Sequence, residues 1–175
     1  MAEVLRQMED VPGIYPPPPT GATIPPHPDV VWSRIENYIA YRWTTRQVKW
    51  IVEGPGEWVP PLAPIDLVVS IDIWDGSNWQ STTPDSGYLG GYCLNEGKYR
   101  FVMDIGNGSP PGAVNEAYLR LAKYMAETDK KAGASSYSAE LDILKEAYTR
   151  SPSWMAKAMQ NSGAADLLRP YRRVS

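Results

Sequence analysis

The spacing at which apolar residues recur changes twice along this chain, and these changes limit the folds that it can adopt. Between about residues 46 and 105, apolar and polar residues alternate as they do in half-buried strands. On either side of this block, apolar residues recur every three or four positions, as they do in helices. Because the strands form one consecutive block between helices, the sequence predicts an α+β fold, a small helical bundle with an antiparallel β-sheet or sandwich inserted at about residues 46–105.

Turn residues divide the β block into strands. A first strand is predicted around residues 48–52, and a second around residues 67–74. The Asp75-Gly76 turn then predicts a hairpin whose partner strand contains Trp79. Residues 88–94 and 98–105 are expected to pair with each other as a further hairpin. The block should therefore hold about five or six strands.

Four helices are expected outside the β block. Helical spacing predicts helices over residues 29–43, 112–131 and 137–150, and Ser151-Pro152 is typical of the start of a fourth that ends near Gly163. These boundaries divide the chain into an N-terminal arm, residues 1–28, a main domain, residues 29–163, and an extended C-terminal tail, residues 164–175.

The N-terminal arm is rich in proline. Proline has a fixed φ angle and no amide donor, so the run in residues 12–28 favours extended polyproline II and excludes helix or central strand. Two interpretations stay open, a disordered tail and an arm laid on a neighbouring subunit. We expect residues 1–28 to become ordered only in an assembly.

Residues that could support catalysis are scarce. The chain has one histidine, His27, which lies among prolines, and one cysteine, Cys93, which its neighbours suggest is buried. No nucleotide-binding or catalytic motif is present, so we expect no enzyme activity, no catalytic residue, no cofactor and no metal site. A net charge of -3 disfavours general nucleic-acid binding. Nothing in the sequence predicts a membrane span or a signal peptide, so we expect no membrane partner and synthesis in a reducing cytoplasm.

Aromatic residues are unusually frequent, with seven Trp and eleven Tyr. Such side chains suit interfaces as well as cores. Trp58, Trp74 and Trp79 stand near turn signals, where they could form a stacking platform for sugars. A carbohydrate- or receptor-binding β module is therefore an alternative function.

The C-terminal tail differs from the rest of the chain in its charge. Arginine and tyrosine dominate binding hot spots, and here they alternate with apolar residues within a few positions. Two interpretations stay open, a frayed basic terminus and an anchor that becomes ordered in an acidic, apolar-lined groove of a partner, and the anchor is favoured. The residues expected to bind are Leu167, Leu168, Arg169, Pro170, Tyr171, Arg172 and Arg173.

The order of several short segments resembles the head-to-tail connector, or adaptor, family of long-tailed bacteriophages and gene transfer agents. The resemblance covers roughly residues 30–174, and its specific feature is the order of the segments together with the Leu-Leu-x-Pro-Tyr-Arg-Arg ending. The family usually begins with an additional bundle helix where this chain has its proline-rich arm. The resembling segments are residues 35–43, 46–52, 60–76, 99–101, 111–117 and 167–173.

The resemblance implies a structural role in the neck of a virion, assembled from subunits made in the cytoplasm of a bacterial host. Family members form dodecameric rings on the portal protein, which implies that residues 167–173 bind the portal here. The opposite side of the ring would receive the next neck or tail connector protein. DNA would pass through the bore without specific binding, and the copies of this chain would contact one another as a homo-oligomer.

Overall fold

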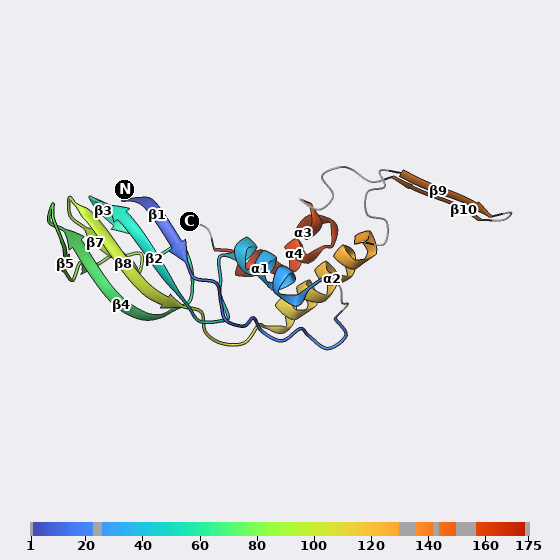
Figure 1. Ribbon diagram of the computed structural model, residues 1–175, viewed down its shortest axis with the longest axis horizontal. Coiled ribbons are helices and arrows are strands. Elements are labelled where there is room, and N and C mark those ends of the chain that lie inside the picture. Colours follow the sequence, from blue (N-terminus) through green and yellow to red (C-terminus); the bar gives the residue numbers. More distant parts are fainter. Residues whose placement is uncertain (1, 23–25, 130–135, 142–143, 150–156, 174–175) are drawn as a thin grey trace. The chain divides into compact units, whose positions relative to one another are not determined.

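The chain folds into two compact units in the computed structural model, which describes residues 2–22, 26–129, 136–141, 144–149 and 157–173. The first unit comprises Met1–Pro16, Ala40–Ser109 and Arg173–Ser175, and the second comprises Pro17–Ile39 and Pro110–Arg172. The large sheet belongs to the first unit and the helices belong to the second (Figure 1). The predicted α+β class is confirmed.

The first unit is built on a five-stranded antiparallel sheet with the order β1-β2-β8-β4-β5. The side chains of β2 alternate between a buried face and a more exposed face, as the period-two pattern of the sequence predicts. The central strand β8 is buried along one face through Tyr99, Phe101, Met103 and Ile105. The strands are β1 (Glu3–Glu9), β2 (Arg46–Glu53), β4 (Ile65–Trp74), β5 (Trp79–Ser81) and β8 (Lys98–Ile105).

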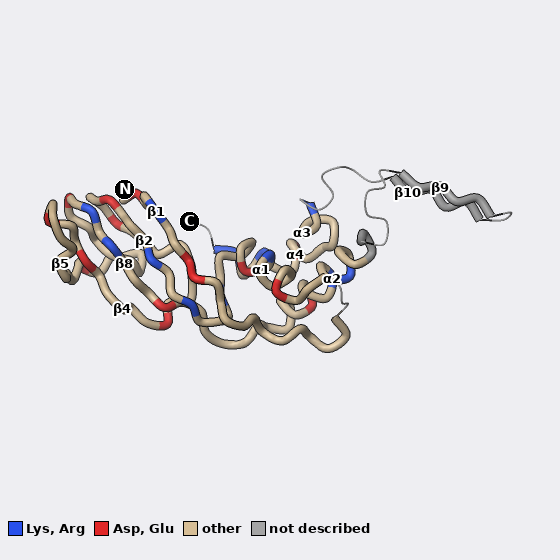
Figure 2. The backbone as a smooth tube through the Cα atoms, in the orientation of Figure 1, with Lys and Arg blue, Asp and Glu red and all other residues tan. Residues whose placement is uncertain are grey.

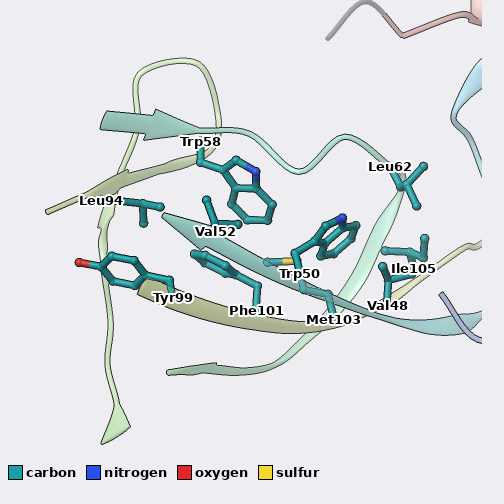
Figure 3. Close-up of a cluster of buried hydrophobic side chains, with 10 residues drawn as sticks. All are labelled: Val48, Trp50, Val52, Trp58, Leu62, Leu94, Tyr99, Phe101, Met103 and Ile105. Carbon is teal, nitrogen blue, oxygen red and sulfur yellow. The ribbon is translucent and has the colours of Figure 1, made fainter. Parts of the chain in front are cut away.

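A three-stranded sheet supplies the other half of this core. It has the order β3-β7-β6, formed by β3 (Gly56–Trp58), β7 (Tyr92–Leu94) and β6 (Asp85–Ser86). Its Trp58 lies against Phe101 of β8, with 4.3 Å between ring centroids (Figure 3). The buried cluster therefore joins two sheets, and its members are Val48, Trp50, Val52, Trp58, Leu62, Leu94, Tyr99, Phe101, Met103 and Ile105.

The second unit packs short helices around two longer ones. Trp32 of α1 and Tyr118 of α2 are both buried, and their ring centroids lie 4.8 Å apart. Helix α4 packs on α2, and α3 contacts both α2 and α4. The helices are α1 (Pro28–Ile39), α2 (Gly112–Asp129), α3 (Ala158–Asn161) and α4 (Ala164–Leu168), followed by the 3-10 turn η1 (Arg169–Tyr171).

The helix predicted over residues 137–150 is wrong. This segment forms a hairpin of β9 (Ser136–Leu141) and β10 (Leu144–Thr149), in which Tyr148 stands opposite Tyr137 in register. Leu141, Leu144 and Tyr148 suggested a helix, but residues 137, 139 and 141 also fit a period of two. Short segments of this length satisfy both periods, and a lone helix of this length is marginal without a surface to pack on. The helix predicted from residue 151 is present only as α3, and residues 151–156 lie outside the described residues.

Two predictions about the strands had opposite outcomes. The hairpin around Asp75-Gly76 is confirmed, with Trp74 opposite Trp79. The predicted pairing of residues 88–94 with residues 98–105 is wrong, because β7 pairs with β3 and β6 whereas β8 pairs with β2 and β4. An apolar central strand is stabilised best by a long strand on each side, which three-residue β7 cannot provide.

Two further expectations also differ from the structure. Residues 3–9, expected in an arm that is ordered only in an assembly, form edge strand β1 in the single chain. Cys93, expected to be buried, is exposed, because in β7 it faces away from the core side occupied by Leu94.

Candidate interaction surfaces

The C-terminal segment proposed to bind a partner is folded rather than extended. Residues 164–168 form α4, and residues 169–171 form η1. Leu168 is fully buried, so its side chain belongs to the core of the second unit and is not available to a partner. Leu167 is half-buried. The exposed part of the predicted site is Arg169, Pro170, Tyr171, Arg172 and Arg173.

Local contacts hold this segment on the second unit. Gly163 has a φ of 74°, which lets the chain turn from α3 into α4 where a side chain would be strained. The Arg172 guanidinium lies 5.5 Å from the centre of the Tyr38 ring of α1. The exposed arginines are therefore presented from a folded base, and the expectation of a detachable extended tail is corrected.

The three tryptophans of the alternative sugar-binding function do not form a common platform. Trp58 is 4% exposed and belongs to the core between the two sheets. Trp74 and Trp79 form a tilted pair 5.2 Å apart, and the guanidinium of Arg100 covers Trp79 at 4.7 Å. Arg100 is held there by Asp72 at 2.8 Å. The pair of Trp74 and Trp79 therefore packs across the β4–β5 hairpin.

A buried charged cluster joins β1 to the rest of the first unit. The Glu9 carboxylate accepts hydrogen bonds from Arg42 at 2.6 and 2.9 Å and from Arg46 at 3.2 Å. Both arginines are buried, and Arg46 also lies 5.5 Å from the ring centre of Tyr15. Burial alone would raise the pKa of Glu9, but the hydrogen bonds and charges of the two arginines outweigh it and lower that pKa. The sequence carried no signal for this cluster, because its members are far apart in the chain.

Replacing Glu9 with glutamine should destabilise the first unit by about 3 kcal/mol, since it removes one partner of a buried ion pair. Because the pKa of Glu9 is lower in the folded chain than its ordinary value of 4.5, this stabilisation is present above pH 4.5 and is lost as the pH falls below it. Urea denaturation of both proteins at several pH values measures the difference.

The matched control for that variant is Glu3→Gln, which removes the same charge from an exposed position of β1. It should change the free energy of unfolding by less than about 0.5 kcal/mol. Equal stability of Glu9→Gln and the natural chain at neutral pH would show that the cluster does not hold β1.

Within the described residues, no helix is long and apolar enough to cross a membrane, and no three His, Cys, Asp or Glu side chains gather as metal ligands.

Comparison with known structures shows which fold this is. Neither a protein-family model nor a curated protein sequence matches the chain. Three solved chains share its fold over 85% of its length. They come from the virion of a native gene transfer agent particle (14% identity, TM-score 0.53, 75% of that chain), from the neck of the native particle computed with C12 symmetry (15%, 0.52, 80%) and from the neck of the empty particle computed with C6 symmetry (14%, 0.53, 76%). At this identity the likeness establishes the fold, which this chain shares with chains of gene transfer agent particles and their necks.

Proposed function

We propose that this chain is a structural subunit of the neck of a tailed phage or a phage-derived particle, an adaptor that forms a ring between the portal and the next connector protein. One observation carries the proposal: the shared fold covers 85% of this chain and 75 to 80% of chains described from the virion and neck of a gene transfer agent. The family resemblance of the sequence points to the same role independently.

The ring part of the proposal rests on symmetry. The neck structures that share this fold were computed with C12 and C6 symmetry. A closed ring of identical subunits needs two different contact surfaces on each copy, one for each neighbour. A dodecamer of this chain would enclose a bore for DNA, and a net charge of -3 suits passage without tight binding to phosphates.

The portal is the proposed partner of the exposed C-terminal residues. Three arginines and one tyrosine, Arg169, Tyr171, Arg172 and Arg173, are solvent-exposed on or directly after η1. Guanidinium groups pair well with carboxylates, so an acidic rim on the portal is the surface they fit. Since Leu168 is buried, Tyr171 is the aromatic anchor left for this contact.

Reversing the charge of two of these arginines, Arg169→Glu with Arg173→Glu, should weaken portal binding about tenfold or more at low salt, and less at high salt because exposed charges are screened. A pull-down with purified portal at two salt concentrations measures the effect. The control Lys123→Glu with Lys157→Glu makes the same change in net charge at exposed positions of the second unit. Equal weakening by both pairs would show that net charge, and not this segment, drives binding.

The function as a whole is tested by removing the gene from the phage or particle system that encodes this chain. We expect filled heads and separate tails that do not join, and a ring of this chain below the portal in a cryo-EM map of the complete particle. Complete particles without the chain would overturn the proposal.

A further inference from the structure

The outer edge of β4 is open and apolar along most of its length. Strand β8 lies on one side of β4, and β5 on the other side pairs only with Asp72, Ile73 and Trp74. In the described part of the chain, no strand pairs with the outer edge of residues 65–70. Four apolar side chains there are 39 to 56% exposed, namely Ile65, Leu67, Val68 and Val69.

The opposite edge of the same sheet is also open. Strand β1 pairs with β2 on one side and ends the strand order on the other. Its Val4 and Leu5 are 40% and 45% exposed. Long apolar edges are a liability, which natural proteins reduce with lysines or prolines or by covering the edge. Strand β4 carries no lysine or arginine (Figure 2) and its sequence contains no proline, so its edge should be covered in the working assembly.

The strand directions allow one edge to cover the other. Every pairing in the five-stranded sheet is antiparallel, so β1 and β4, separated by β2 and β8, run in opposite directions. In the proposed dodecamer, neighbours are related by a rotation of about 30°, which lies within the range of about 10 to 35° found between neighbouring strands. The β4 edge of one copy and the β1 edge of the next would therefore meet with opposite chain directions.

We propose that β4 of each subunit pairs with β1 of its neighbour, in the register that places Val4 opposite Val68 and Gln7 opposite Ile65. This inference rests on the proposed ring and identifies the contact between its copies. Side chains directly opposite in an antiparallel pair share a face. Val4 and Val68 stand opposite the buried Val52 and Met103 within their own sheet, so both are on the core face.

The same register also places Gln7 and Ile65 on one face and sets opposite charges against each other. Gln7 stands opposite Trp50 and Ile65 stands opposite Ile105 within the sheet, so these two also share the core face. Arg6 falls opposite Asp66, so the charges at the middle of the two edges are opposite in sign.

The irregularity of β1 has a counterpart in β4 in this register. The pairing of β1 shifts between Val4 and Arg6, and that of β4 shifts between Ile65 and Leu67 and again, beyond the matched residues, between Val68 and Ser70. From residue 4 to residue 7, β1 advances three residues while its partner β2 advances two. From residue 65 to residue 68, β4 likewise advances three residues while β8 advances two. Because both steps contain one extra residue, the core faces of the two strands stay aligned across the contact.

Cysteine cross-linking tests the pairing and its register. In a Cys93→Ser background, Val4→Cys and Val68→Cys are made as separate proteins, because opposite residues on one face come within reach of a disulfide. Mixing the two proteins under mild oxidation should give a linked dimer, and neither alone should. The double variant should form a ladder of linked species that ends at the closed ring.

A second pair controls for chance collisions. Val4→Cys mixed with Leu67→Cys has the same exposed edge but places the two thiols on opposite faces, so the linked dimer should be largely lost. Linking of Val68→Cys to itself would indicate a two-fold contact between β4 edges and would overturn the proposal, as would equal linking of the control pair.

The cross-linking outcome is separable from that of the proposed function. If the double variant is incorporated into particles as a ring and no β1–β4 link forms there or in solution, the pairing is wrong and the neck function stands. If the chain is absent from particles, the neck function fails, and the mixing experiment with the purified proteins still decides whether the two edges pair.

Discussion

Replacing Phe101 with alanine should lower the free energy of unfolding of the first unit by about 3 to 5 kcal/mol. Phe101 is fully buried on the central strand β8, and its ring lies 4.3 Å from that of Trp58 and 5.1 Å from that of Tyr92. Both neighbours come from the three-stranded sheet, so removing the Phe101 ring would open a cavity between the two sheets (Figure 3). Urea denaturation followed by circular dichroism measures the loss.

Tyr88→Ala is the matched control for this substitution, since it removes an aromatic ring that is 88% exposed on the same unit. It should change stability by less than about 0.5 kcal/mol. A loss below about 1 kcal/mol for Phe101→Ala would mean that the two sheets do not share one core.

Replacing Leu168 with alanine should cost about 2 to 5 kcal/mol of the stability of the second unit. Its side chain is fully buried at the end of α4, the helix that packs on α2. Thermal denaturation of Leu168→Ala measures this loss of stability. The comparison variant is Leu167→Ala, at the half-buried neighbouring position, which should lose clearly less stability. Similar losses for both would place Leu168 at the surface instead.

This result bears on how the proposed binding to the portal is measured. Leu168→Ala would weaken binding by unfolding the helix that presents Arg169 and Tyr171, and truncation after Ala164 would do the same. Substitutions confined to the exposed residues are therefore the informative ones, because they leave the core of the second unit intact.

The strong local patterns were enough to predict much of the fold. Helix α2 agrees closely with its prediction over residues 112–131, because its apolar residues recur at helical spacing between a proline-rich start and a glycine stop. The β4–β5 hairpin was found from its Asp75-Gly76 turn, and β2 from strict alternation. Helix α1 ends earlier than predicted, at Ile39, where Ala40 adopts a φ of 56°. The family resemblance was drawn from the sequence alone, and solved chains of gene transfer agent particles share the fold.

The candidate surfaces were only partly predictable. The charged, aromatic C-terminal segment was found from composition, and its arginines are exposed. Whether a leucine beside them faces a partner or its own core depends on how the helices pack, and Leu168 is buried in α4, the helix that packs on α2. The open edges of β1 and β4 could not be seen in the sequence, since an edge strand and a central strand share the same alternation.

The sequence by itself determined the local conformations: where the chain turns, which segments alternate at a period of two, and which residues are apolar enough to require burial. Only the tertiary structure decided how these pieces pair, because strand pairing and ion pairing depend on residues far apart in the chain. It placed β8 between β2 and β4, paired β1 with β2 and joined Glu9 to Arg42 and Arg46, and paired residues 136–141 with residues 144–149. The physical reason is that local propensities differ by fractions of a kilocalorie per residue, whereas the burial and hydrogen bonding available only in the assembled fold contribute far more.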